Sequence, residues 1–301
     1  MPTRIALVGV GRWGRRLLPG LAERFEVRVA CTRGNPESAD WLRTHAPEVE
    51  RTTSLDRVLE DASIDAVVIA TPIESHAAIA AHVLAAGMHV FVEKPLATSV
   101  EEAAALVTAA DSSGRVLFVG HTLLYDPSFA QLRSRAQDDP VELARMTWRK
   151  LGTFDSDLFW NLVSHHVSLA LALFGAQPTG VEVLAAAGVV TECDLAVVRL
   201  AFGDGRSATT DVDRVAPNVE RSVTAVSESG TLTVWRDGGL YELLDRAFVP
   251  IATRGRDALD EELDAFAAAV ELGAPFPSDG AHATAVVETV ARIRGVAAAA
   301  A

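Results

Sequence analysis

Short, almost uninterrupted apolar runs recur in the first part of the chain, and a helical spacing of apolar residues follows most of them. The first run, Ile5 to Val8, precedes a segment with apolar positions at Trp13, Leu17 and Leu21. Further runs lie at residues 27–30, 66–70, 89–92 and 116–120. Continuous apolar runs are typical of strands buried on both faces, and a spacing of three or four residues is typical of helices. Their alternation predicts right-handed βαβ units and a mostly parallel sheet.

Polar residues and glycines mark the ends of the predicted helices. Asn35-Pro36 places a proline at the first helical position, and Ser99 with Glu102 has the spacing of a capping box. A helix over residues 75–86 is predicted to end at Gly87, because glycine favours the left-handed conformation that closes many helices. These signals place helices between the strands, as in a doubly wound α/β domain.

The pattern changes near residue 121. Strands are predicted at residues 142–150, 182–190, 194–202, 207–213, 221–227 and 231–236, and helices from Asp126-Pro127, over 159–174, over 259–272 and over 281–296. Consecutive strands joined by turns indicate an open, mostly antiparallel sheet. We therefore predict an α/β Rossmann dinucleotide-binding domain over residues 1–121. An α+β domain for substrate binding and oligomerisation, with an open, mostly antiparallel sheet, is predicted over residues 122–301.

Composition narrows the class of protein. Of the 301 residues, 49% are hydrophobic, which is enough for a sizeable core. The formal net charge is −13, from 27 basic and 40 acidic residues, which argues against a nucleic-acid partner but leaves room for a local anion site. No run approaches the roughly 20 apolar residues of a membrane span, and no signal peptide is recognised. Cys31 and Cys193 match no metal spacing, so we expect reduced thiols in a cytoplasmic protein without a metal or a membrane partner.

The segment from Gly9 to Gly14 has the strand–turn–helix context of a G-x-G-x-x-G motif. Gly9 permits the tight turn, Gly11 lets the backbone approach a pyrophosphate, and Gly14 lets the helix pack closely on the strand. With Arg12 and Trp13 between the glycines, we predict that this turn and the following helix N-terminus bind the phosphates of a dinucleotide. The alternative is an ordinary glycine-rich turn between a strand and a helix.

The end of the second strand bears on which dinucleotide is bound. Enzymes that use NAD usually carry Asp or Glu there for the ribose 2′-hydroxyl, whereas this chain has Thr32 and Arg33. A carboxylate would repel a 2′-phosphate, and an arginine can pair with it through two hydrogen bonds. We therefore predict that NADP(H) is preferred over NAD(H). The alternative is that Arg33 is a solvated loop residue.

With the glycine turn VGVGRWG, four more segments carry a family resemblance: ATPIESH (70–76), AAGMHVFVEKPLA (85–97), VGHTLLYDP (119–127) and WNLVSHHVSLALALFG (160–175). In this order they resemble the Gfo/Idh/MocA family of glucose–fructose oxidoreductase-like NAD(P)-dependent dehydrogenases. The strand-rich remainder and the final helices are also similar to that family's carboxyl-terminal domain. The resemblance implies a soluble oxidoreductase that acts on a small molecule.

The resemblance also implies roles for residues of the first domain. Thr71 and Pro72 would line the nicotinamide side, His76 would lie near the cofactor, and Glu93 would help to position it. Lys94 would lie beside the nicotinamide and bond the substrate hydroxyl or carbonyl.

These roles agree with elementary chemistry. An ammonium stabilises charge that grows on a carbonyl oxygen, and partial desolvation lets it exchange a proton. The alternative for Lys94 is a surface lysine before a proline turn. His121, after the fifth apolar run, is a further candidate pocket residue.

The second domain departs from the family pattern. Many members carry Asp-x-x-x-His on the long buried helix, and this chain has Asn161 and His165 at those positions. Residues four apart share a helix face, so both can point at one substrate. Histidine titrates near neutrality and suits proton transfer, whereas an asparagine only orients a hydroxyl or an imidazole. His166 follows directly, and one of these two adjacent histidines is expected to be a core residue. We take His165 as the functional one, because it has the spacing from Asn161 and the family position.

Leu123-Leu124 stand where many members have arginine, which predicts a less anionic pocket. Asp155 and Asp157 are candidates to supply a carboxylate instead, or to act as loop and capping residues.

The resulting hypothesis is an NADP(H)-dependent oxidoreductase that transfers hydride to or from a carbon bearing oxygen or nitrogen, with Lys94 and His165 handling the proton and Asn161 holding the substrate. The alternatives are a non-catalytic NADP-binding sensor or scaffold, and a glycoside-processing enzyme that uses transient oxidation. A homodimer or homotetramer through the carboxyl-terminal sheet is expected, because an exposed apolar face usually marks an interface. Residues expected on that face are Val183, Val197, Leu200 and Val223.

Overall fold

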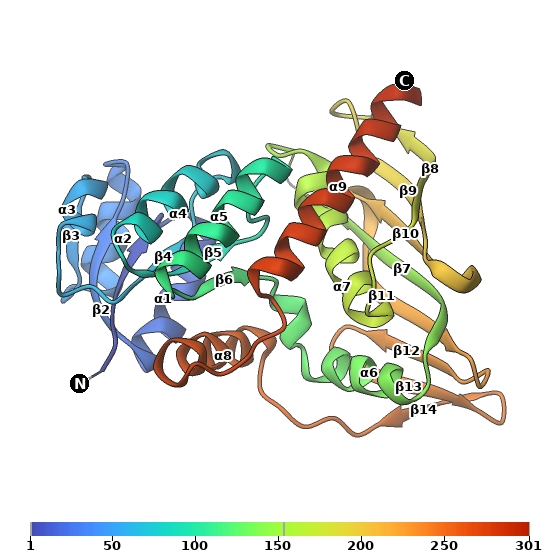
Figure 1. The fold of residues 1–301 in the computed structure, drawn as a ribbon. Coiled ribbons are helices and arrows are strands. Elements are labelled where there is room, and N and C mark those ends of the chain that lie inside the picture. The colour runs from blue at the N-terminus through green and yellow to red at the C-terminus, as the bar shows by residue number, and fades with distance from the viewer. Residues whose placement is uncertain (1, 153, 301) are drawn as a thin grey trace. The chain divides into compact units, whose positions relative to one another are not determined.

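The computed structural model describes residues 2–152 and 154–300, and its chain divides into two compact units (Figure 1). The first unit comprises residues 1–121 with 259–284, and the second comprises residues 122–258 with 285–301. By packing, therefore, residues 259–284 group with the first unit, although they belong to the second of the two contiguous domains predicted from the sequence. The domain boundary itself stays a prediction, because packing does not show which part folds independently.

The first unit contains a six-stranded parallel sheet in the order β3-β2-β1-β4-β5-β6. Its strands are β1 (Arg4–Val8), β2 (Glu26–Cys31), β3 (Glu50–Thr52), β4 (Ala66–Ile69), β5 (His89–Glu93) and β6 (Leu117–Gly120). Strand order reverses direction beside β1, which is where doubly wound sheets bind dinucleotides. The α/β Rossmann prediction is confirmed. The short edge strand β3 was not predicted, because the sequence Glu-Arg-Thr carries no apolar run.

Helices cover this sheet and end where the sequence signals indicate. They are α1 (Arg12–Arg24), α2 (Pro36–His45), α3 (Leu55–Leu59), α4 (His76–Ala85), α5 (Val100–Ser113) and α8 (Ala258–Leu272), with a 3₁₀ turn η1 (Ile73–Ser75) before α4. Asn35 caps α2 by accepting a hydrogen bond from the Glu37 N–H at 2.9 Å. Ser99 caps α5 through the Glu102 N–H at 3.3 Å, but its hydroxyl donates to the Glu101 carboxylate, so only half of the predicted capping box forms.

Helix α8 belongs to the first unit because of its aromatic packing. The Phe266 ring, which is fully buried, lies 5.3 Å from the Phe91 ring and 5.4 Å from the Phe118 ring between centroids. Aromatic side chains bury large areas and contribute strongly to cores. The contact between α8 and strands β5 and β6 therefore joins a late segment of the chain to the Rossmann sheet.

The second unit contains an eight-stranded sheet in the order β14-β13-β12-β11-β7-β10-β9-β8. Its strands are β7 (Val141–Leu151), β8 (Gly180–Ala187), β9 (Leu195–Ala201), β10 (Ser207–Asp213), β11 (Val215–Ser227), β12 (Leu232–Arg236), β13 (Gly239–Leu244) and β14 (Ala247–Ile251). Strands β7 and β10 are parallel, and the remaining neighbours are antiparallel. The prediction of an open, mostly antiparallel sheet is confirmed.

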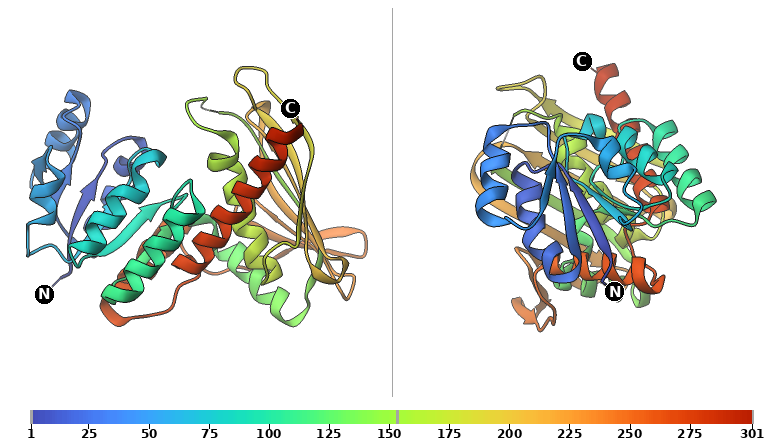
Figure 2. Two further views of the ribbon diagram at one scale, coloured as in Figure 1. Left: turned by 45° about the horizontal axis from the view of Figure 1, so that its top comes forward. Right: turned by 90° about the vertical axis from the view of Figure 1, so that its left-hand side faces the viewer.

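One face of this sheet is covered by helices and the other is bare (Figure 2). The covering helices are α6 (Pro127–Asp138) and α7 (Ser164–Phe174), the latter preceded by a π-helical turn η3 (Phe159–Val163). Leu200 and Val223 are fully buried, and Val183 pairs in register with buried Val198, so all three face the helices. Placing these three on the open face was wrong, because alternation separates two faces without showing which one is covered. Val197 lies on the bare face, opposite Asp211.

The last helix, α9 (Gly280–Ala300), is the longest, with 21 residues. Its second half packs in the second unit, where the Arg294 guanidinium lies 5.7 Å from the Trp160 ring centroid and 3.2 Å from the Asp157 carboxylate. Among the described residues, no helix combines the length and apolar composition needed to cross a membrane.

Candidate functional site

The glycine turn after β1 is shaped by three residues with different steric surroundings. Gly9 has φ of +99°, and an ideal Cβ there would lie 2.5 Å from the Ala70 carbonyl oxygen. A Cβ on Gly14 would lie 2.0 Å from the Gly9 carbonyl oxygen, whereas one on Gly11 would meet no atom within 4 Å. Gly9 and Gly14 are therefore required by the protein's own packing, and Gly11 leaves an exposed stretch of backbone open to a ligand.

This open backbone lies at the N-terminus of α1. Gly11 is the N-cap residue, and within the described part of the chain no side chain caps the first N–H groups of the helix. Unpaired N–H groups and the positive end of the helix dipole favour phosphate. Arg12, in the first turn, is exposed beside them. Together with the absent Cβ at Gly11, this arrangement fits the pyrophosphate of a dinucleotide.

Trp13 connects the glycine turn to the end of β5. Its indole N–H donates a hydrogen bond to the Glu93 carboxylate, and the Arg16 guanidinium lies 4.9 Å from the Trp13 ring centroid. Burial raises the pKa of Glu93 to about 7, against the hydrogen bond from Trp13 and the charge of Lys94, which lower it. A carboxyl group that ionises near neutrality therefore lies next to the lysine predicted to be catalytic.

His76 joins the loops that follow β4 and β5. Its Nδ1 lies 2.8 Å from the Pro95 carbonyl oxygen, and its Nε2 lies 2.9 Å from the Thr71 carbonyl oxygen. Burial lowers the pKa of His76, so the ring is neutral near pH 7 and its single N–H donates to one of the two carbonyls. The side chain positions the loop carrying half-buried Lys94, rather than presenting a free ring nitrogen. Pro72, beside Thr71, is exposed.

His121 follows β6 and is 2% exposed. Its ring centroid lies 5.5 Å from that of His282, and neither of its ring nitrogens has a hydrogen-bond partner among the described residues. Burial, with the nearby His282 and Lys94, holds the pKa of His121 well below its usual range. The sequence offers no reason to group His282 with His121, since it belongs to a distant helix.

Thr32 and Arg33 follow β2 at the carboxyl edge of the same sheet. The Thr32 N–H donates to the Thr52 carbonyl at 3.0 Å, and its hydroxyl accepts from the Gly34 N–H at 3.2 Å. Arg33 is exposed. The turn is held by backbone contacts, and the guanidinium remains accessible to a ligand.

In the second unit, the two adjacent histidines have different surroundings. The His166 ring is buried and its Nδ1 lies 2.9 Å from the Thr210 hydroxyl, and burial lowers its pKa to about 3. The His165 ring is partly exposed and lies 4.8 Å from the Trp148 ring between centroids. His166 is thus a core histidine, whereas the His165 side chain is partly exposed.

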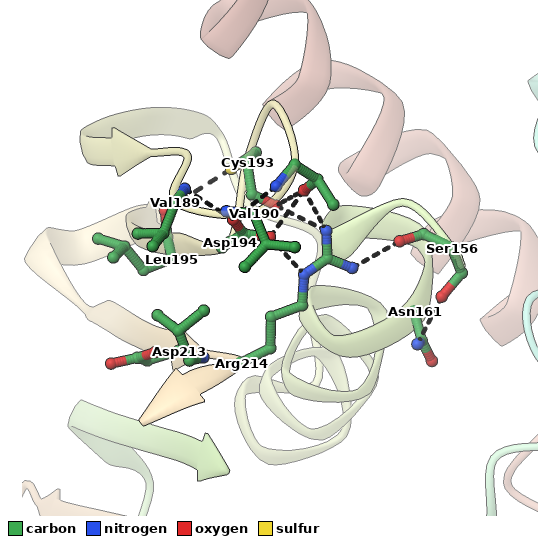
Figure 3. A network of polar contacts seen from close by, with 11 residues as sticks. Ser156, Asn161, Val189, Val190, Cys193, Asp194, Leu195, Asp213 and Arg214 are labelled. Carbon is green, nitrogen blue, oxygen red and sulfur yellow. Dashed lines mark hydrogen bonds and ion pairs between the residues drawn. The ribbon is translucent and has the colours of Figure 1, made fainter. Parts of the chain in front are cut away.

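Asn161 is held by a network of polar contacts that starts at a buried ion pair (Figure 3). Its amide donates to the Ser156 hydroxyl at 2.8 Å, and the Ser156 carbonyl accepts from the Arg214 guanidinium at 2.6 Å. The same guanidinium donates to Asp194 at 2.9 Å. Asp194 and Arg214 are 0% and 2% exposed, so the pair is shielded from solvent.

Asp194 is itself fully hydrogen-bonded. One carboxylate oxygen accepts from the N–H groups of Val189 and Thr191 at 2.7 and 2.8 Å and from that of Val190, and the other accepts from the Thr191 hydroxyl at 2.7 Å. Burial alone would raise its pKa, but these hydrogen bonds hold the pKa of Asp194 well below its usual range. The network therefore ties one loop, residues 189–194, to the segment that carries Asn161.

Other predicted pocket residues are part of the fold. Leu123 and Leu124 are 8% and 1% exposed, so they belong to the core and do not define the polarity of an open surface. Asp157 accepts from the Trp160 N–H at 3.0 Å and pairs with Arg294, which makes it a capping residue. Asp155 is exposed.

The sequence patterns did not identify the three residues of the polar network, Ser156, Asp194 and Arg214. They also did not identify Trp148 or the two cationic side chains beside it, Lys150 and Arg221. The spacing of Trp148 and Lys150, two apart on one strand, was the one available signal for a shared face.

Two family models match the chain. The model of the oxidoreductase family with an NAD-binding Rossmann fold (GFO_IDH_MocA) matches residues 3–121, and the GFO/IDH/MocA C-terminal domain model matches residues 126–233. The UDP-N-acetylglucosamine 3-dehydrogenase of Acidithiobacillus ferrooxidans is 28% identical over 97% of this chain and 96% of its own. The inositol 2-dehydrogenase of Rhizobium meliloti is also 28% identical, over 97% of each chain.

Solved structures extend this similarity to the fold. That of the Acidithiobacillus ferrooxidans enzyme has a TM-score of 0.90 at 25% identity and covers 98% of each chain. That of GenD2 from gentamicin A biosynthesis, in complex with NAD, has a TM-score of 0.84 at 25% identity and covers 100% of this chain and 95% of its own.

Proposed function

The chain belongs to the Gfo/Idh/MocA family of NAD(P)-dependent oxidoreductases, and from that premise we propose that it transfers hydride to or from a carbon bearing oxygen or nitrogen on a sugar-like or biosynthetic small molecule. One observation carries the proposal. Lys94, at the carboxyl end of β5, is joined by contacts to the glycine turn: Gly9 touches the loop at Ala70, and His76 ties that loop to Pro95.

The roles of the residues follow from their chemistry. Gly11, Arg12 and the start of α1 would hold the pyrophosphate, and the bound nicotinamide supplies or accepts the hydride. During reduction the Lys94 ammonium would stabilise negative charge on the substrate oxygen and donate a proton to it, and during oxidation the neutral Lys94 amine would accept the hydroxyl proton. His165 relays that proton toward solvent, since an imidazole both donates and accepts near neutrality. Asn161, oriented by Ser156, donates or accepts a hydrogen bond to hold the substrate.

For the cofactor, we propose a preference for NADP(H). Support comes from exposed Arg33 at the end of β2, where no carboxylate stands to repel a 2′-phosphate. The GenD2 structure contains NAD, so the relative's cofactor does not decide the preference of this chain. Titration of the protein with NADPH and NADH by fluorescence should give tighter binding of NADPH. Arg33→Ala should remove that difference and leave NADH binding unchanged.

For the substrate, the named relatives support a polyol or sugar derivative, since one acts on UDP-N-acetylglucosamine and another on inositol. The test is a scan of NAD(P)H formation and oxidation with neutral sugars, inositols, sugar nucleotides and simple ketones. With a responsive substrate, Lys94→Ala should lower turnover by about 10²- to 10⁴-fold while NADPH binding stays measurable. The control is Arg28→Ala, which also removes a positive charge from the first unit but at an exposed position.

Unchanged turnover in Lys94→Ala would exclude the proposed role of this lysine. Cofactor binding with no substrate at all would instead indicate the sensor function, and cofactor that stays bound without net turnover would indicate glycoside processing through transient oxidation.

We further propose that the bare face of the eight-stranded sheet pairs with a second copy, giving a homodimer or homotetramer. Leu143 on this face is 48% exposed, its cross-strand neighbour Val226 is partly exposed beside it, and Val197 is partly exposed further along the same face. Exposed apolar groups on a sheet face favour burial in an interface. Leu143→Glu should shift the species observed by light scattering toward the monomer.

A further inference from the structure

The helix-covered face of the second unit's sheet carries an indole with two cationic side chains beside it. Trp148 and Lys150 are two apart on β7 and therefore share a face, and Arg221 on β11 is the cross-strand partner of Trp148. From the Trp148 ring centroid, the Lys150 Nζ lies at 5.8 Å and the Arg221 Cζ at 5.6 Å. We call these three residues the Trp148 cluster. All three are partly exposed, so the helices do not seal this part of the sheet.

Arg221 is held by aromatic rings. Its guanidinium also lies 5.3 Å from the ring centroid of Trp235, which is fully buried and donates its N–H to Asp126 at 2.9 Å. Among the described residues, no carboxylate forms an ion pair with Arg221. Its neighbour Glu220 is paired in register with Arg149, on the opposite face.

Two aromatic contacts restrict the guanidinium without neutralising it. Arginine keeps its charge at all relevant pH values, and its planar fork binds carboxylate and phosphate through two parallel hydrogen bonds. Cation–π contacts engage the flat face of the guanidinium and leave the N–H groups at its edge for an oxyanion. Arg221 is therefore preorganised for an anionic ligand, which lowers the entropy lost on binding.

The cluster is adjacent to the histidine proposed to relay the proton. The His165 ring lies 4.8 Å from the same Trp148 ring. The His165 imidazole and the Arg221 guanidinium therefore contact the same side chain, the Trp148 indole. A small molecule bound at His165 can therefore place an anionic substituent beside Arg221 and Lys150.

The overall charge makes a local cationic site necessary for such a ligand. The formal net charge of −13 repels anions, so a phosphorylated or carboxylated substrate depends on local positive groups for attraction.

We propose that the Trp148 cluster binds the anionic group, a phosphate or a carboxylate, of the sugar-like substrate. The proposal rests on the proposed function, because it takes His165 as part of the site. It narrows the substrate class from sugar-like molecules in general to those with a negative charge close to the reacting carbon.

Calorimetric titration of the protein saturated with NADP tests this directly, because the bound dinucleotide occupies the other phosphate site. The probes are glucose 1-phosphate, UDP, glucuronate and glucose. We expect at least one anionic probe to bind about tenfold or more tightly than glucose. Arg221→Gln, which removes the charge and keeps a planar polar group, should abolish this difference, and Arg221→Lys should restore part of it.

The matched control is Arg145→Gln, which removes an exposed arginine from the same strand as Trp148 but on the bare face. It should leave all four affinities unchanged. If Arg221→Gln does not fold, Lys150→Met gives a second readout with an expected severalfold loss for the anionic probes.

The outcomes separate the sources of the anion. Binding of the phosphate probes alone identifies a phosphorylated or nucleotide-linked substrate, and equal binding of glucuronate identifies a carboxylate. Glucose binding as tight as the anions, or equal affinities in wild type and Arg221→Gln, would overturn the proposal. Failure of both NADP and NAD to bind contradicts the proposed function, and that titration is a separate measurement.

Discussion

The two units prepare their candidate groups for ligands in different ways. In the first unit, the glycine turn offers backbone N–H groups. Its shape depends on the absence of side chains at Gly9 and Gly14, and the bare backbone at Gly11 leaves room for a ligand. In the second, Asn161 and His165 are oriented by other side chains, through Ser156 and Trp148. A backbone site suits a cofactor shared by many enzymes, whereas a site built from side chains can change with each substrate. The contrast can be tested by substitutions that affect one kind of support at a time.

The largest effect is expected at Gly14. In Gly14→Ala the new methyl group would meet the Gly9 carbonyl oxygen, a backbone atom that cannot rotate away, so the strand and helix must separate. We expect a loss of about 4 kcal/mol or more in the free energy of unfolding, measured by urea denaturation. Gly11→Ala is the matched variant: it should unfold like wild type but bind NADPH about tenfold or more weakly. Equal unfolding of the two variants would contradict the steric account.

A large effect is also expected at the buried ion pair of the second unit. Arg214→Met leaves the Asp194 carboxylate buried without its cation and releases Ser156. Breaking a buried pair is strongly destabilising, and we expect the thermal midpoint to fall by about 10 °C. Arg294→Met, which breaks an exposed pair with Asp157, is the control and should shift the midpoint by roughly 2 °C or less. Similar midpoints for both variants would show that the network contributes little.

An effect that depends on pH is expected at Glu93. Because burial raises its pKa to about 7, the folded protein keeps a proton that the unfolded chain releases from about pH 4.5 upward. Between these values the unfolded state binds fewer protons, so stability falls as the pH rises. Glu93→Gln stays neutral and should match the wild-type midpoint at pH 5 and exceed it at pH 8. The lowered pKa values of buried His121 and His166 make stability rise with pH below about pH 6.5. This contribution is present in both the wild type and the variant, so it cancels when their midpoints are compared.

The smallest effect is expected at Ser156. Ser156→Ala removes the acceptor for the Asn161 amide and should cost about 1 kcal/mol in stability. With a responsive substrate, the Michaelis constant should rise more than the turnover number falls, because the role proposed for Asn161 is to hold the substrate and not to transfer a proton. Ser113→Ala, at the exposed end of α5, serves as the control. A fall in turnover without a change in the Michaelis constant would assign Asn161 a different role.

The sequence predicted the first unit better than the second because its signals are local. Apolar runs followed by a glycine or a proline, such as Gly9 after β1 and Pro72 after β4, mark several βα junctions. Only β3 was missed, since an edge strand of three polar residues buries nothing. In the second unit, strand β11 begins at Val215, earlier than the predicted residue 221, because Pro217 and the exposed residues after it hide its start.

The candidate site shows the same difference. Two short motifs, each only a few residues long, were enough to name Gly9 and Gly14 in one case and Glu93 and Lys94 in the other. Arg221 could not, because its neighbour Trp148 becomes adjacent only through the register of β7 and β11. The buried pair of Asp194 and Arg214 was missed for the same reason: neither residue belongs to a motif, and their contact depends on two separate strands.

A last consequence concerns Gly120, at the end of β6, in the history of this protein family. A Cβ at this position would lie 3.1 Å from the carboxyl carbon of Glu93, tighter than most real contacts. A larger residue at position 120 would require the Glu93 carboxyl group to shift by a few tenths of an ångström. The two positions are therefore expected to covary among relatives, so that the glycine is inherited together with the glutamate, although they lie on different strands.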